Sequence, residues 1–117
     1  MATRVVLAAT EGGLKGQEFA FTPGWQVVLG RSPDCTLRLA GDIGVSRQHC
    51  LIELDEAGAR VKDLGSLNGT FVNGQSIGQR DRGRQADAAA AGPPRRLLQE
   101  GDELRIGAHA FRVEVAG

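Results

Sequence analysis

The stretch DLGSLNGTFVNG, at residues 63–74, places one Asn-Gly pair on each side of a short apolar segment. Asn-Gly is a strong signal for a tight hairpin turn, because both residues tolerate a positive φ. The chain is therefore predicted to reverse at Asn68-Gly69 and again at Asn73-Gly74, with a three-residue strand between the turns. Rigid loops of this kind are where a small domain carries its recognition residues.

Alternating apolar residues on both sides of this stretch predict further strands. Before it, Cys50, Ile52 and Leu54 alternate inward, and the chain turns at residues 55–58 into the strand of Ala59 and Val61. After it, a last hairpin turns at residues 107–108. Its inward residues are Leu104, Ile106, Phe111, Val113 and Val115. Earlier strands are predicted at residues 4–9, 17–21, 26–29 and 37–39. Many short strands separated by turns, with no helical pattern, indicate an all-β fold, an antiparallel β-sandwich.

Length and composition indicate one domain that spans residues 1–117. Fourteen basic and fourteen acidic residues cancel, which argues against binding to nucleic acid or to an anionic membrane through overall charge. No apolar run is long enough for a signal-peptide core or a membrane span. Cys35 and Cys50 lack metal-ligand spacing, so we expect reduced thiols, a cytoplasmic location and no metal site. We also expect a monomeric domain.

Residues 78–96 read GQRDRGRQADAAAAGPPRR and break the strand periodicity. Loops longer than about 12–15 residues are usually functional or disordered. We therefore predict a mobile insertion loop here. An alternative interpretation is a basic lip that attracts an acidic partner.

A set of polar and glycine residues falls between the predicted strands and is not explained by them. They occur as Gly30-Arg31, Ser46-Arg47-Gln48-His49, Asn68-Gly69-Thr70 and Asn73-Gly74. In this order and spacing, they resemble the motifs of the forkhead-associated (FHA) domain. The resemblance extends by motif from about Val27 to Gly74. It implies an FHA/SMAD-like sandwich of about eleven strands that binds phosphothreonine peptides through loops at one end.

The chemistry of these residues suits such a ligand. A phosphothreonine carries roughly −1.5 to −2 charges and three strong acceptor oxygens. Arg31 offers a planar fork for two parallel hydrogen bonds, and Ser46 offers a hydroxyl. Arg47 can donate through its backbone N–H or its guanidinium. The amide of Asn68 can both donate to and accept from a peptide main chain, which fixes the ligand's register.

The resemblance also assigns supporting roles and exposes one departure. It implies that His49 braces the binding loops, that Gly30 and Gly69 allow unusual backbone conformations, and that Thr70 bonds locally. Many members carry Ser or Thr where this chain has Leu67, so one phosphate donor is missing or is replaced by Ser66. We therefore include Ser66 and Leu67 among the expected phosphopeptide-contacting residues.

The sequence also offers two alternatives to phosphopeptide binding. Ser46, His49 and Asp63 are the residue types of a hydrolase triad, but the Gly-x-Ser-x-Gly elbow is absent, and so is a phosphate-binding P-loop. We therefore expect neither an enzyme nor a cofactor. An interaction or oligomerisation module of the same fold that needs no phosphate remains the alternative.

The expected function is that of a phosphothreonine-dependent adaptor in Ser/Thr kinase signalling. Its expected partner is a phosphothreonine-containing protein or peptide, such as a kinase or its substrate. Away from the site, Trp25 and the four phenylalanines are predicted to lie in the core, and His109 on the surface.

Overall fold

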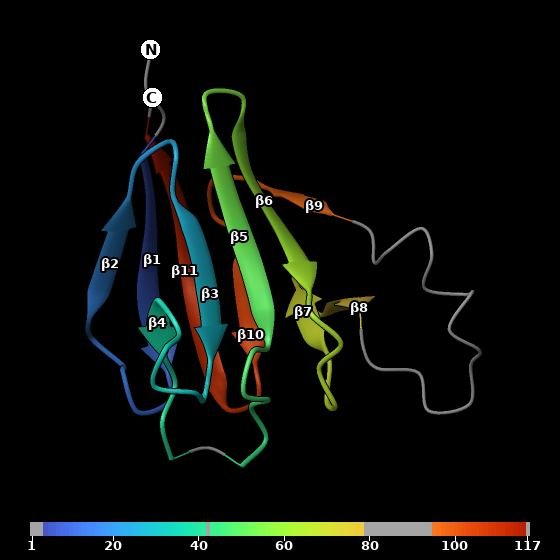
Figure 1. Cartoon of the computed structure of the whole chain (residues 1–117). Coiled ribbons are helices and arrows are strands. Elements are labelled where there is room, and N and C mark those ends of the chain that lie inside the picture. Colours follow the sequence, from blue (N-terminus) through green and yellow to red (C-terminus); the bar gives the residue numbers. More distant parts are fainter. Residues whose placement is uncertain (1–3, 42, 79–94, 117) are drawn as a thin grey trace, which may run out of the picture.

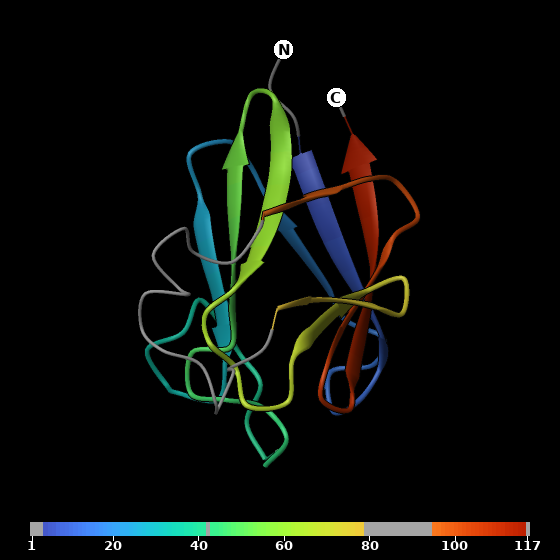
Figure 2. The same cartoon turned by 90° about the vertical axis from the view of Figure 1, so that its right-hand side faces the viewer.

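The computed structural model describes residues 4–41, 43–78 and 95–116, and these form two β-sheets packed face to face (Figures 1 and 2). The described residues form eleven strands and no helix, so none that is long and apolar enough to cross a membrane. This confirms the predicted all-β sandwich. The insertion predicted at residues 78–96 lies mostly outside the described residues, but its two ends belong to strands.

One sheet has six strands in the order β2-β1-β11-β10-β7-β8. They are β1 (Arg4–Glu11), β2 (Glu18–Phe21), β7 (Thr70–Val72), β8 (Gln75–Gly78), β10 (Glu103–Ile106) and β11 (His109–Ala116). The centre of the sheet is the long antiparallel pair β1 and β11, in which Arg4 lies opposite Ala116. The first and last described strands are thus neighbours, which closes the domain.

The other sheet has five strands in the order β4-β3-β5-β6-β9. They are β3 (Gln26–Gly30), β4 (Leu37–Arg38), β5 (Cys50–Asp55), β6 (Gly58–Asp63) and β9 (Arg96–Leu98). Only β3 and β4 pair in parallel among the described strand pairs. This sheet carries the ends of β3, β4 and β6, from which the predicted recognition loops start.

The core lies between the sheets and consists of the inward residues that the alternation predicts. Leu7, Val27, Ile52, Val61 and Phe111 are all fully buried or nearly so. Burial of apolar area at about 25 cal/mol per Å² supplies the main stabilisation of such a sandwich. Burial of the inward faces therefore sets the register of the strands. The register in turn fixes where each strand ends and so where the loops lie.

The turn at Asn73-Gly74 forms as predicted, since Asn73 has a φ of 53° and Gly74 a φ of 81°. Positive φ at both central residues is the requirement of a type I′ hairpin turn. At Asn68-Gly69 only the glycine has a positive φ, of 93°. The first pair is therefore a loop with one left-handed residue and the second is a true hairpin.

Two predictions about aromatic and histidine side chains are wrong. His109 is buried, because it lies two residues before Phe111 and shares the inward face of β11. Trp25 is 49% exposed, at the edge of the sandwich, where its ring packs edge-on against Phe21 with 5.9 Å between centroids. Phe111 is the one fully buried phenylalanine among the four, and the other three are partly buried.

Candidate functional site

Three loops meet at one end of the sandwich, the lower end in Figure 1, where β3, β4 and β6 terminate. They are the β3–β4 loop (residues 31–36), the β4–β5 loop (39–49, without residue 42) and the β6–β7 loop (64–69). The predicted ligand-contacting residues lie on these loops. The turn between β5 and β6 is at the opposite end (Figure 1).

The β3–β4 loop is attached to the β4–β5 loop through its backbone. Arg31 donates its N–H to the carbonyl of Ser46 at 3.0 Å, and Ser32 donates to the carbonyl of Arg47 at 3.1 Å. The Arg47 carbonyl also accepts from the thiol of Cys35 at 3.1 Å. These bonds lie beyond the ends of β3 and β5 and hold the two loops together.

Gly30 has a glycine for steric reasons. A Cβ at this position would lie 2.1 Å from the carbonyl oxygen of Arg47, far inside van der Waals contact. At Gly30 the two loops lie so close together that no side chain fits between them. Gly30 is not among the glycines with a positive φ, so the unusual backbone conformation expected of it is not found, and the glycine is required by this close approach instead.

Arg31 is exposed, and its side chain is fixed at one point. Its Nε donates to the carbonyl of Val45 at 3.1 Å, which leaves the two terminal nitrogens of the guanidinium for other partners. No carboxylate among the described residues pairs with it. A guanidinium held in this way presents its fork to an anion with little loss of side-chain freedom.

The hydroxyl of Ser46 connects the β4–β5 loop to the β6–β7 loop. Its Oγ accepts the backbone N–H of Leu67 at 3.0 Å. With its oxygen engaged as acceptor, the hydroxyl proton remains available to donate. The side chain of Leu67 is 38% exposed at the same loop.

Asn68 makes a second connection between these loops, because its Nδ2 donates to the carbonyl of Gly44 at 3.0 Å. Its amide oxygen has no partner among the described residues and can accept a hydrogen bond. Arg47 is also exposed and projects from the same loop as Ser46. Arg31, Ser46, Arg47, Leu67 and Asn68 are thus on adjoining loops, four of them with polar side chains.

His49 is fully buried and joins two of the loops. Its Nδ1 accepts the backbone N–H of Ser46 at 3.1 Å, and its Nε2 lies 2.8 Å from the carbonyl oxygen of Gly69. A carbonyl only accepts, so the ring carries its proton on Nε2. Both ring nitrogens are engaged by the backbone, and His49 does not activate the Ser46 hydroxyl as a hydrolase triad requires.

Ser66 is placed differently from the prediction. Its side chain is fully buried, and its hydroxyl bonds to the carboxylate of Asp63 and accepts the N–H of Gly69 at 3.0 Å. A hydroxyl in this position cannot reach a ligand on the surface. Ser66 therefore belongs with the residues that shape the loop, and it does not replace the donor missing at Leu67.

Asp63 has a structural role in the site that was not predicted from the sequence. Its buried carboxylate accepts four hydrogen bonds, from the backbones of Gly65 and Ser66 at 2.8 Å, from the Ser66 hydroxyl and from the Thr70 hydroxyl at 2.7 Å. The bond to Thr70 agrees with the local role predicted for that residue. The signal was the spacing Asp-x-Gly-Ser, in which an aspartate bonds backbone amides two and three residues ahead.

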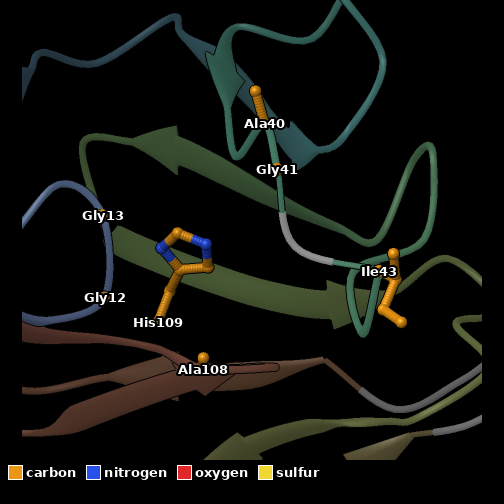
Figure 3. Close-up of a pocket in the computed structure, with 7 residues that line it drawn as sticks. All are labelled: Gly12, Gly13, Ala40, Gly41, Ile43, Ala108 and His109. Atoms are coloured by element: carbon orange, nitrogen blue, oxygen red, sulfur yellow. The ribbon is translucent and has the colours of Figure 1, made fainter.

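A depression of about 360 Å³ lies beside the recognition loops. Figure 3 shows the ring of His109 between Gly12 and Gly13 of the β1–β2 loop and the stretch Ala40–Gly41. None of the predicted phosphate-contacting residues lines it. The predicted contacts are on the loop tips, and this depression is separate from them.

The comparison with protein families decides the classification. A family model, the FHA domain, matches residues 27–88, just over half of the chain. The chain belongs to the FHA domain family. The match includes every recognition loop described above.

Two of the curated relatives of this FHA domain are described as a bacterial regulator and a bacterial inhibitor. The chain is 37% identical over 78 residues to the glycogen accumulation regulator GarA of Mycolicibacterium smegmatis, covering 67% of this chain and 39% of that protein. It is also 37% identical over 78 residues to the oxoglutarate dehydrogenase inhibitor of Corynebacterium efficiens, covering 67% of this chain and 43% of that protein. The chain thus spans about two fifths of the length of these relatives.

Solved FHA domains have the same fold over nearly the whole chain. A domain studied for phosphothreonine-dependent FHA interactions has a TM-score of 0.75 and 29% identity, covering 97% of this chain and 98% of its own. The kinase-interacting FHA domain of the kinase-associated protein phosphatase of Arabidopsis has a TM-score of 0.79 and 25% identity, covering 99% and 96%. The predicted family and fold are both confirmed.

Proposed function

We propose that this FHA domain is a phosphothreonine-dependent binding module that acts as an adaptor in Ser/Thr kinase signalling. The observation that carries the proposal is the set of hydrogen bonds that joins Arg31, Ser46 and Asn68 on three loops. The similarity to a domain described by its phosphothreonine-dependent interactions supports it. The partner would be a phosphothreonine-containing protein, such as a kinase or a kinase substrate.

In the proposed complex, the phosphate binds between Arg31 and Ser46. The terminal nitrogens of Arg31 donate two parallel bonds to phosphate oxygens, and the Ser46 hydroxyl donates to a third oxygen. Arg47 adds charge from the same loop. Because Arg31 and Ser46 are already attached to neighbouring loops, little ordering is needed when the ligand binds.

Asn68 recognises the peptide main chain in this proposal. Its Nδ2 is held by the Gly44 carbonyl, so its orientation is set before the ligand arrives. The amide oxygen then accepts a backbone N–H of the peptide. This contact fixes the register of the peptide without reading its side chains.

The first prediction concerns Arg31→Ala and its effect on binding. Hydrogen bonds to charged groups contribute about 1.5–3 kcal/mol each, so the loss of two should lower the affinity for a phosphothreonine peptide at least about a hundredfold. The measurement is a titration of the wild-type domain and the variant with a phosphothreonine peptide library and matched unphosphorylated peptides.

The control is Arg112→Ala, which removes an exposed arginine from β11, away from the three loops. It should leave the affinity unchanged. Equal binding of phosphorylated and unphosphorylated peptides by the wild-type domain would refute the proposed function.

A phosphate-independent interaction module is the second candidate, and one observation favours it. Ile43, Leu64 and Leu67 expose apolar side chains on the recognition loops, with Ile43 94% exposed. Such residues suit an apolar protein surface as well as a peptide. In the same titration, this candidate requires binding that survives both dephosphorylation of the ligand and Arg31→Ala.

We also propose a cytoplasmic location. Both cysteines are free and buried, which is the usual state of thiols in a reducing compartment. Imaging of the tagged full-length protein tests this assignment.

A further inference from the structure

Arg38 lies beside the proposed phosphate site but has no assigned role. It is the last residue of β4, where it pairs in parallel with Gly30, and its side chain is exposed. Its Nε donates to the backbone carbonyl of Arg31 at 3.3 Å. The guanidinium of Arg38 is therefore held against the main chain of the residue proposed to bind the phosphate.

Three arginines close to this end form no ion pair with a carboxylate of the described residues. Among the described residues, the arginines that pair with carboxylates are Arg60, Arg95, Arg105 and Arg112. Arg31, Arg38 and Arg47 are exposed and have no carboxylate partner in that part of the chain. Asp34, in the same loop as Arg31, is bonded by the hydroxyl of Ser32.

The chain has a formal net charge of zero, so the grouping of these three arginines results from the arrangement of the charges in the fold. Like charges on neighbouring side chains repel each other, and an anion placed between them relieves the repulsion. One phosphothreonine supplies up to about two negative charges. The phosphate is proposed to bind at Arg31, Ser46 and Arg47, which leaves the terminal nitrogens of Arg38 for a further negative group on the ligand.

We propose that Arg38 is a specificity-determining residue that binds a carboxylate close to the phosphothreonine of the ligand. The inference rests on the proposed function, because it needs the phosphothreonine to lie at Arg31. The Nε of Arg38 donates to the Arg31 carbonyl, so the two terminal nitrogens of its guanidinium remain to donate parallel hydrogen bonds to a carboxylate. The preferred ligand is an acidic phosphothreonine peptide.

The experiment compares three phosphothreonine peptides by fluorescence anisotropy at low salt. One has alanines around the phosphothreonine, one has two glutamates before it and one has two glutamates after it. The proteins are the wild-type domain, Arg38→Gln, Arg38→Lys and the matched control Arg60→Gln. Arg60 forms an exposed pair with Asp55 near the β5–β6 turn, at the other end of the molecule.

We expect one of the glutamate peptides to bind the wild-type domain about two- to fivefold more tightly than the alanine peptide, as for an exposed charge pair. Arg38→Gln should abolish this gain, whereas Arg38→Lys should keep part of it and Arg60→Gln all of it. The gain should shrink as salt is added. Because Arg38 is exposed, its variants should keep the melting temperature of the wild-type domain.

Two results would overturn the inference: equal binding of all three peptides by the wild-type domain, or a glutamate gain that persists in Arg38→Gln. Both leave the proposed function intact if the alanine peptide still binds only when phosphorylated. If that peptide binds equally well without phosphate, the proposed function itself fails. The alanine peptide therefore separates the two failures.

Discussion

At the scale of single residues, Gly30 is the most exacting position in the recognition loops. Any Cβ there meets the Arg47 carbonyl oxygen at 2.1 Å, and that oxygen is itself bonded by Ser32 and Cys35. The backbone on both sides is therefore unable to move without breaking hydrogen bonds. Gly30 thus links the stability of the fold to the geometry of the site.

We predict that Gly30→Ala lowers the free energy of unfolding by about 2–3 kcal/mol, the usual cost of an added group in a tightly packed position. The melting temperature should fall by roughly 8–12 °C for a domain of this size. Differential scanning calorimetry measures both quantities. Gly13→Ala is the control, because a Cβ there meets nothing within 4 Å; an equal loss in both variants would contradict the steric explanation.

At the scale of elements, the β6–β7 loop depends on one buried carboxylate. Asp63 ends β6 and accepts hydrogen bonds from Gly65, Ser66 and Thr70, so it holds the whole loop up to the start of β7. Gly78 of β8 packs on it as well, since a Cβ there would lie 2.6 Å from the Asp63 Cβ. The exposed Asn68 therefore lies on a loop that is held in place by the buried carboxylate of Asp63.

We predict that Asp63→Asn destabilises the domain by about 2–3 kcal/mol and weakens phosphopeptide binding. The amide nitrogen replaces an acceptor with a donor, so buried donors lose their partner at a cost of about 1–3 kcal/mol each. Urea unfolding followed by circular dichroism measures the loss. The exposed Glu56→Gln removes the same charge and should have no effect; unchanged stability of Asp63→Asn would show that the loop holds without this carboxylate.

At the scale of the whole molecule, the two buried thiols make the free energy of unfolding depend on pH in the alkaline range. Burial raises the pKa of the Cys50 thiol, and the nearby Asp63 carboxylate adds to the shift. Burial also raises the pKa of Cys35. In the unfolded chain a thiol ionises near pH 8.5, whereas the buried thiol of Cys50 stays protonated. The contribution of the buried Cys50 thiol to the free energy of unfolding is therefore fully present below that pH and is lost as the pH rises above it.

We predict that Cys50 alone lowers the free energy of unfolding by about 2 kcal/mol between pH 8 and pH 10. The check is urea unfolding of the wild-type domain and of Cys50→Ala at several pH values in this range. The variant should be less stable at pH 8 but should lose about 2 kcal/mol less on going to pH 10. Parallel pH profiles of the two proteins would disprove the contribution of this thiol.

The strands that could be predicted from sequence are those with clear alternation, such as β5, β6, β10 and β11. Two strands were missed, β8 and β9, because each has only three or four residues and both border the atypical segment 78–96. The pairing of β3 with β4 in parallel was also not predictable, since strand order depends on contacts between distant segments. Short strands owe their existence to their neighbours in a sheet.

By itself, the sequence determined the fold class, the family and the loops on which the proposed contacts lie, because inward alternation and Asn-Gly turns are local properties of the chain. Only the tertiary structure decided which side chains reach the surface. His109 is buried against Gly12, which is 97 residues away in sequence, and the hydroxyl of Ser46 is engaged by the backbone N–H of Leu67, which is 21 residues away. The guanidinium of Arg38 lies beside the main chain of Arg31 for the same reason, because β4 runs parallel to β3 and alongside it. Burial and proximity are set by long-range packing, which no local pattern encodes.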